Sequence, residues 1–210
     1  RPEGIASVHG LPMIGLETGQ ELADVAPEPD VIEFVDGCLH RIMDHHVRPE
    51  KRYLLENLGP NHEEVDSPPG RVLNPGHSIE DMWFVLHQAR RRKDPGLTKR
   101  AVEVIRWMLE LGWDKKKGGI LLAIDVKGGT PWLPHAEKKI WWPHGEALYA
   151  LLLAHELTRE PWCMEWYWKV HDWSFEHFPD KENGEWHQRL DNEGRVTTEL
   201  IALPVKDPFH

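Results

Sequence analysis

The chain has 210 residues, which is enough for one domain or two and for a substantial hydrophobic core. Its 25 Lys and Arg residues against 35 Asp and Glu residues give a formal charge of -10, which disfavours binding to nucleic acid or to an anionic membrane surface. No apolar run reaches the length of a membrane span, and the two cysteines, Cys38 and Cys163, fit reduced thiols in a cytoplasmic protein better than a disulfide framework.

The first part of the chain predicts a pair of helices followed by a long loop. The helices are expected at Leu11–Val25 and Val31–His46, and a Pro-containing linker separates them. Apolar residues at helical spacing along the second helix indicate one buried face. The loop that follows contains a weak strand at Tyr53–Leu58.

Two further helix pairs are predicted, at Ser78–Arg91 and Leu97–Leu111 and at Gly145–Leu157 and Pro161–His177. Ser78 is expected to be the N-cap of its helix, because it follows a Pro-Gly pair. Segments rich in Asp and Gly follow each helix pair, and they predict short β-hairpins at Gly118–Gly129 and Gly184–Gly194.

A repeat of about 67 residues relates these units. Histidines recur at His9, His77, His144 and His210, at intervals of 68, 67 and 66 residues. Stacked helical hairpins with this period form an open solenoid or a closed ring, and the more apolar helices are expected on the inside. The N-terminal ends of the inner helices then meet at one end of the ring. We therefore expect the four histidines to face a common cavity.

Four segments, in their order and spacing, resemble the N-acylglucosamine 2-epimerase family: RVLNPGHSIEDMWF at 71–84, KKIWWPHGEALYALL at 138–152, FPDKENGEWHQRLDNEG at 178–194 and LPVKDPFH at 203–210. The resemblance covers about residue 11 to the last residue. It implies an all-α protein of the (α/α)6 toroid type. The chain is expected to form a single domain over residues 1–210, with about three helical hairpins and short β-hairpins between them, as the C-terminal half of such a barrel.

The resemblance also implies a reaction. Family members epimerise or isomerise sugars by moving a proton at the carbon next to the carbonyl of an open-chain aldose, through an enediolate. It places the catalytic acid–base pair on His77 and His210 and adds Glu146 to the essential site. Imidazole suits this chemistry because its pKa lies close to the working pH.

Four further residues are expected to bind substrate. Glu80, one turn after His77, could orient the imidazole or hold sugar hydroxyls, and His144 would lie at the rim of the pocket. Trp142 and Trp186 could stack on a pyranose face. Each has a structural alternative, since such residues also cap helices, interact with the helix dipole or cover the end of a barrel.

Several functions remain open. The first is a sugar 2-epimerase acting on N-acetylglucosamine, N-acetylmannosamine or a free hexose, and the second is an aldose–ketose isomerase of the same family. A third, of another class, is a glycan-binding or glycoside-hydrolysing (α/α) barrel that uses Glu80 and Glu146. An inactive barrel fragment is the fourth.

We expect no required cofactor and no metal. Neither the His45–His46 pair nor the His171–His177 pair has the spacing of a zinc site, and both pairs are interpreted as surface residues. An allosteric nucleotide is suggested by the family resemblance alone. The expected partner is a small-molecule sugar, and a homodimer is left open.

Overall fold

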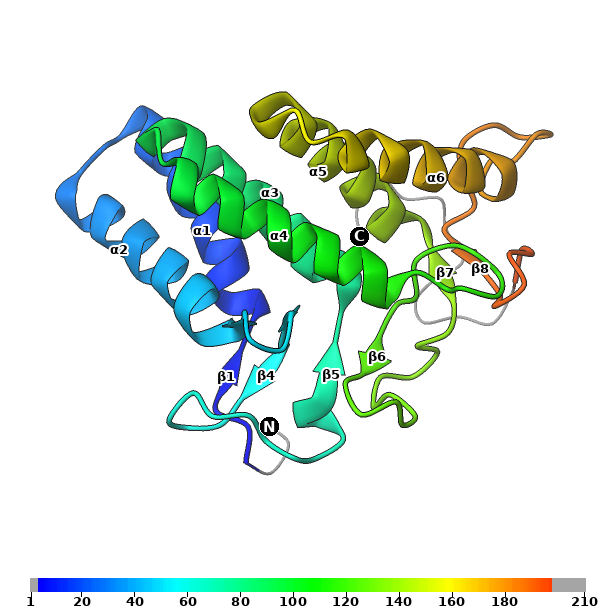
Figure 1. The fold of residues 1–210 in the computed structure, drawn as a ribbon, viewed down its shortest axis with the longest axis horizontal. Helices are drawn as coiled ribbons and strands as arrows, with labels where there is room; N and C mark the ends of the chain where they lie inside the picture. Colours follow the sequence, from blue (N-terminus) through cyan, green and yellow to red (C-terminus); the bar gives the residue numbers. More distant parts are fainter. Residues whose placement is uncertain (1–3, 198–210) are drawn as a thin grey trace.

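The structure, a computed structural model, describes residues 4–197. Three units follow one another in this range, each in the order strand, helix, helix, strand (Figure 1). The units are β1 (Ser7–Val8), α1 (Gly10–Val25), α2 (Pro29–His40) and β4 (Asn57–Leu58); β5 (Val72–Leu73), α3 (Pro75–Arg92), α4 (Pro95–Gly112) and β6 (Ile124–Asp125); and β7 (Lys139–Ile140), α5 (Trp141–Thr158), α6 (Pro161–His177) and β8 (Arg189–Leu190). The predicted helix pairs are confirmed.

The first unit carries three additional short elements. A π-helical turn, Arg41–His46, continues from α2, and a small antiparallel pair follows it, β2 (Val47–Arg48) with β3 (Tyr53–Leu54). A 3-10 turn, Pro69–Arg71, leads into the second unit. The predicted strand at 53–58 is thus divided, because β3 pairs with β2 whereas β4 pairs with β1.

Each unit is closed by an antiparallel strand pair that joins its first strand to its last. Ser7 lies opposite Leu58, Val72 opposite Asp125, and Lys139 opposite Leu190. The two predicted β-hairpins are therefore wrong, since β6 and β8 pair with the strands that precede the inner helices. In Figure 1, β1, β4, β5 and β6 lie below the helices, so the strand pairs gather at one end of them.

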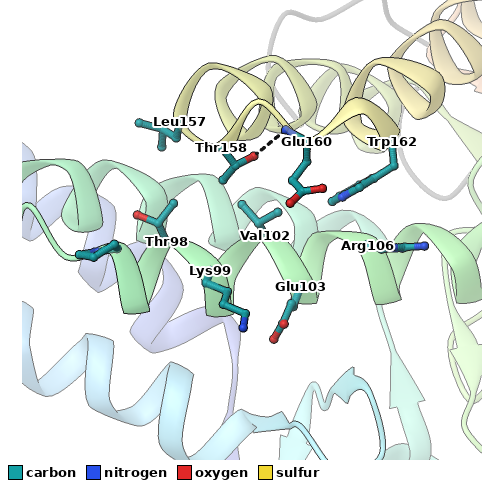
Figure 2. A pocket seen from close by; sticks show the side chains of 10 residues that line it. Thr98, Lys99, Val102, Glu103, Arg106, Leu157, Thr158, Glu160 and Trp162 are labelled. Carbon is teal, nitrogen blue, oxygen red and sulfur yellow. Dashed lines mark hydrogen bonds between the residues drawn. The ribbon is translucent and has the colours of Figure 1, made fainter.

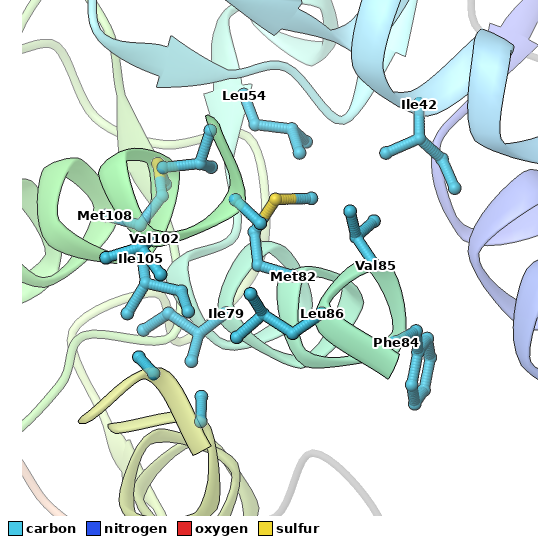
Figure 3. Close-up of a cluster of buried hydrophobic side chains, with 14 of the residues drawn as sticks. Ile42, Leu54, Ile79, Met82, Phe84, Val85, Leu86, Val102, Ile105 and Met108 are labelled. Carbon is cyan, nitrogen blue, oxygen red and sulfur yellow. The ribbon is translucent and has the colours of Figure 1, made fainter. Parts of the chain in front are cut away.

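The helices pack in two layers. The inner helix α3 packs against α1 and α5 and against its own outer helix α4. In Figure 3, Met82 and Leu86 of α3 share the core with Ile105 of α4, while Phe84 points to another side of α3. These four side chains are buried, and burying one such side chain stabilises the fold by about 1.5–3 kcal/mol. No helix among residues 4–197 is both long and apolar enough to cross a lipid bilayer.

The helices α3 and α5 begin three and four residues earlier than predicted, and both changes affect the candidate site. The N-cap of α3 is Asn74, not Ser78, because the Asn74 side chain accepts a hydrogen bond from the backbone N–H of His77 at 3.1 Å. Proline is well tolerated in the first turn of a helix, so α3 begins at Pro75 and α5 begins at Trp141.

Candidate active site

His77 lies in the first turn of α3, and its side chain is 34% exposed. Its ring stacks on the buried ring of Trp142 of α5, with 5.3 Å between centroids and 28° between planes. Gly76 permits this approach, because a Cβ atom at that position would lie 2.6 Å from the Trp142 ring. The geometry holds one face of the imidazole and leaves part of the ring open. Trp142 therefore stacks on His77, whereas we expected its ring to stack on a sugar.

Glu56, which immediately precedes β4, is the carboxylate beside His77. The Nδ1 atom of His77 lies 3.4 Å from each carboxylate oxygen of Glu56. Burial would lower the pKa of His77, but the charge and hydrogen bond of Glu56 outweigh burial and raise it. Sequence reasoning missed this residue, although a Glu next to the leucines Leu54, Leu55 and Leu58 was an available signal.

Two more carboxylates come from the inner helices. Glu80 of α3 is buried, and its charge adds to the rise in the pKa of His77. Glu146 of α5 is half-buried and accepts a hydrogen bond from the indole N–H of Trp83 at 2.7 Å. Trp83, which the sequence analysis did not select, therefore links α3 to the second turn of α5. His77, Glu80 and Glu146 thus come from the N-terminal halves of two neighbouring inner helices.

His144 does not have the position expected of a substrate-binding residue. It is fully buried, its Nε2 atom accepts the backbone N–H of Ile120 at 2.9 Å, and its Nδ1–H donates to the Ile140 carbonyl at 2.7 Å. Burial lowers its pKa to about 3. Both ring nitrogens form hydrogen bonds with backbone groups, so His144 has a structural role.

Replacing His144 with Gln is expected to destabilise the fold by about 1–3 kcal/mol, because a buried backbone group loses its partner. His144 stays neutral in the folded chain, whereas in the unfolded chain it takes up a proton below a pH of about 6.5. The stability contributed by His144 is therefore lost as the pH falls from about 6.5 towards 3. Urea unfolding should give a smaller difference between wild type and variant at pH 5 than at pH 7.5. An equal difference at both pH values would contradict this assignment.

The remaining expected positions are less central. His9 is fully buried and does not face an open cavity, and His210 lies outside the described residues. Trp186 is half-buried, and its ring stacks on the ring of Phe178 with 5.3 Å between the centroids. Contact between the remaining surface of the Trp186 ring and a sugar stays a prediction.

His46 is buried, contrary to the interpretation as a surface residue. Within residues 4–197, no group of three or more His, Cys, Asp or Glu side chains is arranged to hold a metal ion.

A separate cavity of about 440 Å³ lies between α4 and the connection from α5 to α6 (Figure 2). Its lining includes Lys99, Arg106 and Trp162, and the Arg106 guanidinium lies 5.5 Å from the centre of the Trp162 ring. This cavity is at the opposite end of α5 from Glu146, so it is distinct from the cluster around His77. The nucleotide site expected from the resemblance stays a prediction.

Comparison with known sequences supports the resemblance. The family model of N-acylglucosamine 2-epimerase (GlcNAc 2-epimerase) matches residues 28–207. The N-acylglucosamine 2-epimerase of Mus musculus is 33% identical over 203 residues, covering 95% of this chain and 48% of the mouse protein. The Homo sapiens protein is 31% identical over 208 residues, covering 98% of this chain and 48% of the human protein. The chain therefore spans about half the length of the curated relatives it matches.

Solved structures show the same fold. The cellobiose 2-epimerase from Bacillus thermoamylovorans B4167 is similar with a TM-score of 0.81 at 18% identity, and the match covers 98% of this chain and 51% of that chain. A D-mannose isomerase is similar with a TM-score of 0.75 at 18% identity, covering 92% of this chain and 49% of the other. The predicted partial (α/α)6 barrel with three helical hairpins is confirmed. With the family model matching 28–207, the chain belongs to the N-acylglucosamine 2-epimerase family.

Proposed function

We propose that this chain acts as a sugar 2-epimerase or isomerase that removes and returns a proton next to the carbonyl of an open-chain aldose. The observation that carries the proposal is the environment of His77, a partly exposed imidazole that is held between Trp142 and Glu56. Membership of the N-acylglucosamine 2-epimerase family supports this reaction class.

His77 has one nitrogen available for the reaction. Its Nδ1 atom faces Glu56, so Nε2 is the atom that meets the substrate. The neutral ring takes the proton from C2, the electron pair of the C–H bond moves towards the carbonyl, and an enediolate forms. Return of a proton to the opposite face of C2 gives the 2-epimer, and His210 is the residue that the family resemblance assigns to this step. Glu80 and Glu146 are suited to hold sugar hydroxyls.

The same enediolate also leads to a ketose when the proton returns to C1. The epimerase and the aldose–ketose isomerase therefore share the site, and similar structures are described both as a 2-epimerase and as a mannose isomerase. The candidate substrates are N-acetylglucosamine, N-acetylmannosamine and free hexoses. A homodimer and regulation by a nucleotide remain predictions from the resemblance.

Product analysis tests the proposal. The folded protein would be incubated with N-acetylglucosamine, N-acetylmannosamine, glucose, mannose and fructose, and products would be identified by NMR. We expect a 2-epimer or a ketose from at least one sugar, and formation of that product at least about 10²-fold more slowly by the His77→Asn variant.

Two results would overturn the proposal. One is the absence of product with all five sugars. The other is cleavage of an oligosaccharide that depends on Glu80 and Glu146 but tolerates the loss of His77, which is the pattern of a glycoside hydrolase.

A further inference from the structure

Behind His77 lies a line of buried ionisable groups that the proposed reaction does not yet use. The Nδ1 atom of His9 lies 3.5 Å from Oε1 of Glu56, and its Nε2 atom lies 2.7 Å from Oδ2 of Asp81. His9 and Asp81 are fully buried, and Glu56 is 8% exposed. The four groups form one connected series: His77, Glu56, His9 and Asp81.

We propose that Glu56 is a positioning residue for His77 and that His9 and Asp81 hold Glu56 in place. The inference rests on the proposed function and deepens it by assigning the groups that orient the base. A carboxylate at Nδ1 favours the tautomer with the proton on Nδ1, which leaves the lone pair of Nε2 for the substrate. The distance of 3.4 Å is long for a hydrogen bond, as is common in a substrate-free site, and it is expected to shorten when substrate binds.

The fold brings these groups together through specific backbone contacts. His9 follows β1 and Glu56 precedes β4, and the backbone N–H of His9 donates to the carbonyl of Glu56 at 2.8 Å. Asp81 lies one turn after His77 on α3, so these two side chains share one face of the helix. The β1–β4 pair thus places Glu56 beside His9 in the middle of the series, and α3 supplies its two ends, His77 and Asp81.

Stability alone is a weak explanation for this arrangement. Burying charged groups has a desolvation cost, and apolar side chains of similar volume often serve a core as well or better. Burial would lower the pKa of His9, but its contacts with Asp81 and Glu56 raise that pKa to about 10. His9 is therefore an imidazolium between two acidic side chains. Such a cation keeps the Glu56 carboxylate ionised beside His77.

The charges act on His77 in opposite directions. Glu56 raises the pKa of His77, whereas the positive charge of His9 lowers it. Replacing Glu56 with Gln should lower the pKa of His77, by about 1–3 units, because the nearest opposite charge is lost. Replacing His9 with Gln should raise the pKa of His77, because a nearby positive charge is lost. The titratable groups around His77 and Glu56 are His9, which follows β1, Glu80 and Asp81 of α3, and His46 of the π-helical turn.

NMR of protein labelled with ¹⁵N-histidine tests the inference without relying on turnover. We expect His77 of the wild type to carry its proton on Nδ1 when neutral, and its pKa to fall in Glu56→Gln and rise in His9→Gln. Glu50→Gln, the same substitution at an exposed site of the preceding loop, should leave the titration of His77 unchanged. Glu56→Asp keeps the negative charge, so the pKa of His77 in this variant should lie closer to the wild-type value than in Glu56→Gln. This variant also keeps the test possible if Glu56→Gln does not fold.

Kinetics provide the second readout. In Glu56→Gln, kcat should fall by about 10²-fold or more while KM changes little, and the acid limb of the pH profile of kcat/KM should move to lower pH. A neutral His77 with its proton on Nε2 in the wild type, or a pKa equal in Glu56→Gln and Glu50→Gln, would overturn the inference. If the NMR shifts occur but the wild type makes no product from any sugar, the proposed function fails while the assignment of Glu56 holds.

Discussion

Replacing His77 with Asn is expected to reduce the rate of proton transfer at C2 by about 10²–10⁴-fold, the range that general acid–base catalysis contributes. The substitution removes the basic nitrogen that Glu56 and Trp142 orient. Initial rates of product formation, measured by NMR on the best sugar, would give the effect.

A matched control is His40→Asn, because His40 is an exposed histidine on α2 with a surface partner, Asp44. This variant should keep the wild-type rate. Circular dichroism and urea unfolding of both variants separate a chemical effect from a loss of folding. Retention of more than about a tenth of the rate in a folded His77→Asn variant would contradict the assignment of His77 as the base.

Removing the carboxylate of Asp114 is expected to destabilise the fold by about 3–5 kcal/mol, the usual cost of breaking a buried ion pair. The Nζ atom of Lys139 is fully buried and lies 2.8 Å from Oδ2 of Asp114. The other carboxylate oxygen accepts the backbone N–H groups of Lys116 and Lys117. Asp114→Ala would leave the buried ammonium group of Lys139 without its partner.

Urea unfolding at pH 7 measures this effect. The double variant Asp114→Ala with Lys139→Met should recover part of the lost stability, because no unpaired charge stays buried. Burial would raise the pKa of Asp114, but Lys139 and the backbone N–H groups outweigh burial and lower it. The stability from this carboxylate is therefore present above its unfolded pKa and lost as the pH falls through the folded value. A loss below about 1 kcal/mol, or a double variant no more stable than Asp114→Ala, would contradict the account.

The helices were predictable from the sequence, but the strand pairs were not. Apolar spacing and Pro or Gly boundaries are local signals, and the sixth predicted helix, Pro161–His177, matches α6 at both ends. A strand of two residues has little local signal, and its partner can lie far along the chain, as Val72 and Asp125 do. The His9–Glu56 contact depends on such a pair. For this reason the network behind His77 was not found before the structure.

The histidine repeat was real but misleading at two positions, because His9 and His144 are both fully buried. His77 is the third residue of α3, whereas His144 is the fourth residue of α5. One residue turns a helical side chain by about 100°, so the two histidines point in different directions. Glu80 and Glu146, by contrast, are both the sixth residue of their helices. The direction of each side chain depends on its position counted from the first residue of its helix. The spacing of residues in the sequence did not define where each helix begins.

The most direct measurement of the central claim is deuterium incorporation at C2 of the sugar in D₂O, followed by NMR with product formation in the same sample. The account predicts that wild-type protein converts a sugar to its 2-epimer or ketose with deuterium at the carbon that receives the proton, and that His77→Asn slows both signals by about 10²-fold or more. Product without deuterium also agrees with the claim if its formation falls to the same extent in His77→Asn. A base that is shielded from solvent can return to the sugar the same proton that it removed. Exchange or product formed by a folded His77→Asn protein at more than about a tenth of the wild-type rate, or neither signal from the folded wild type, would contradict the claim that His77 moves the C2 proton.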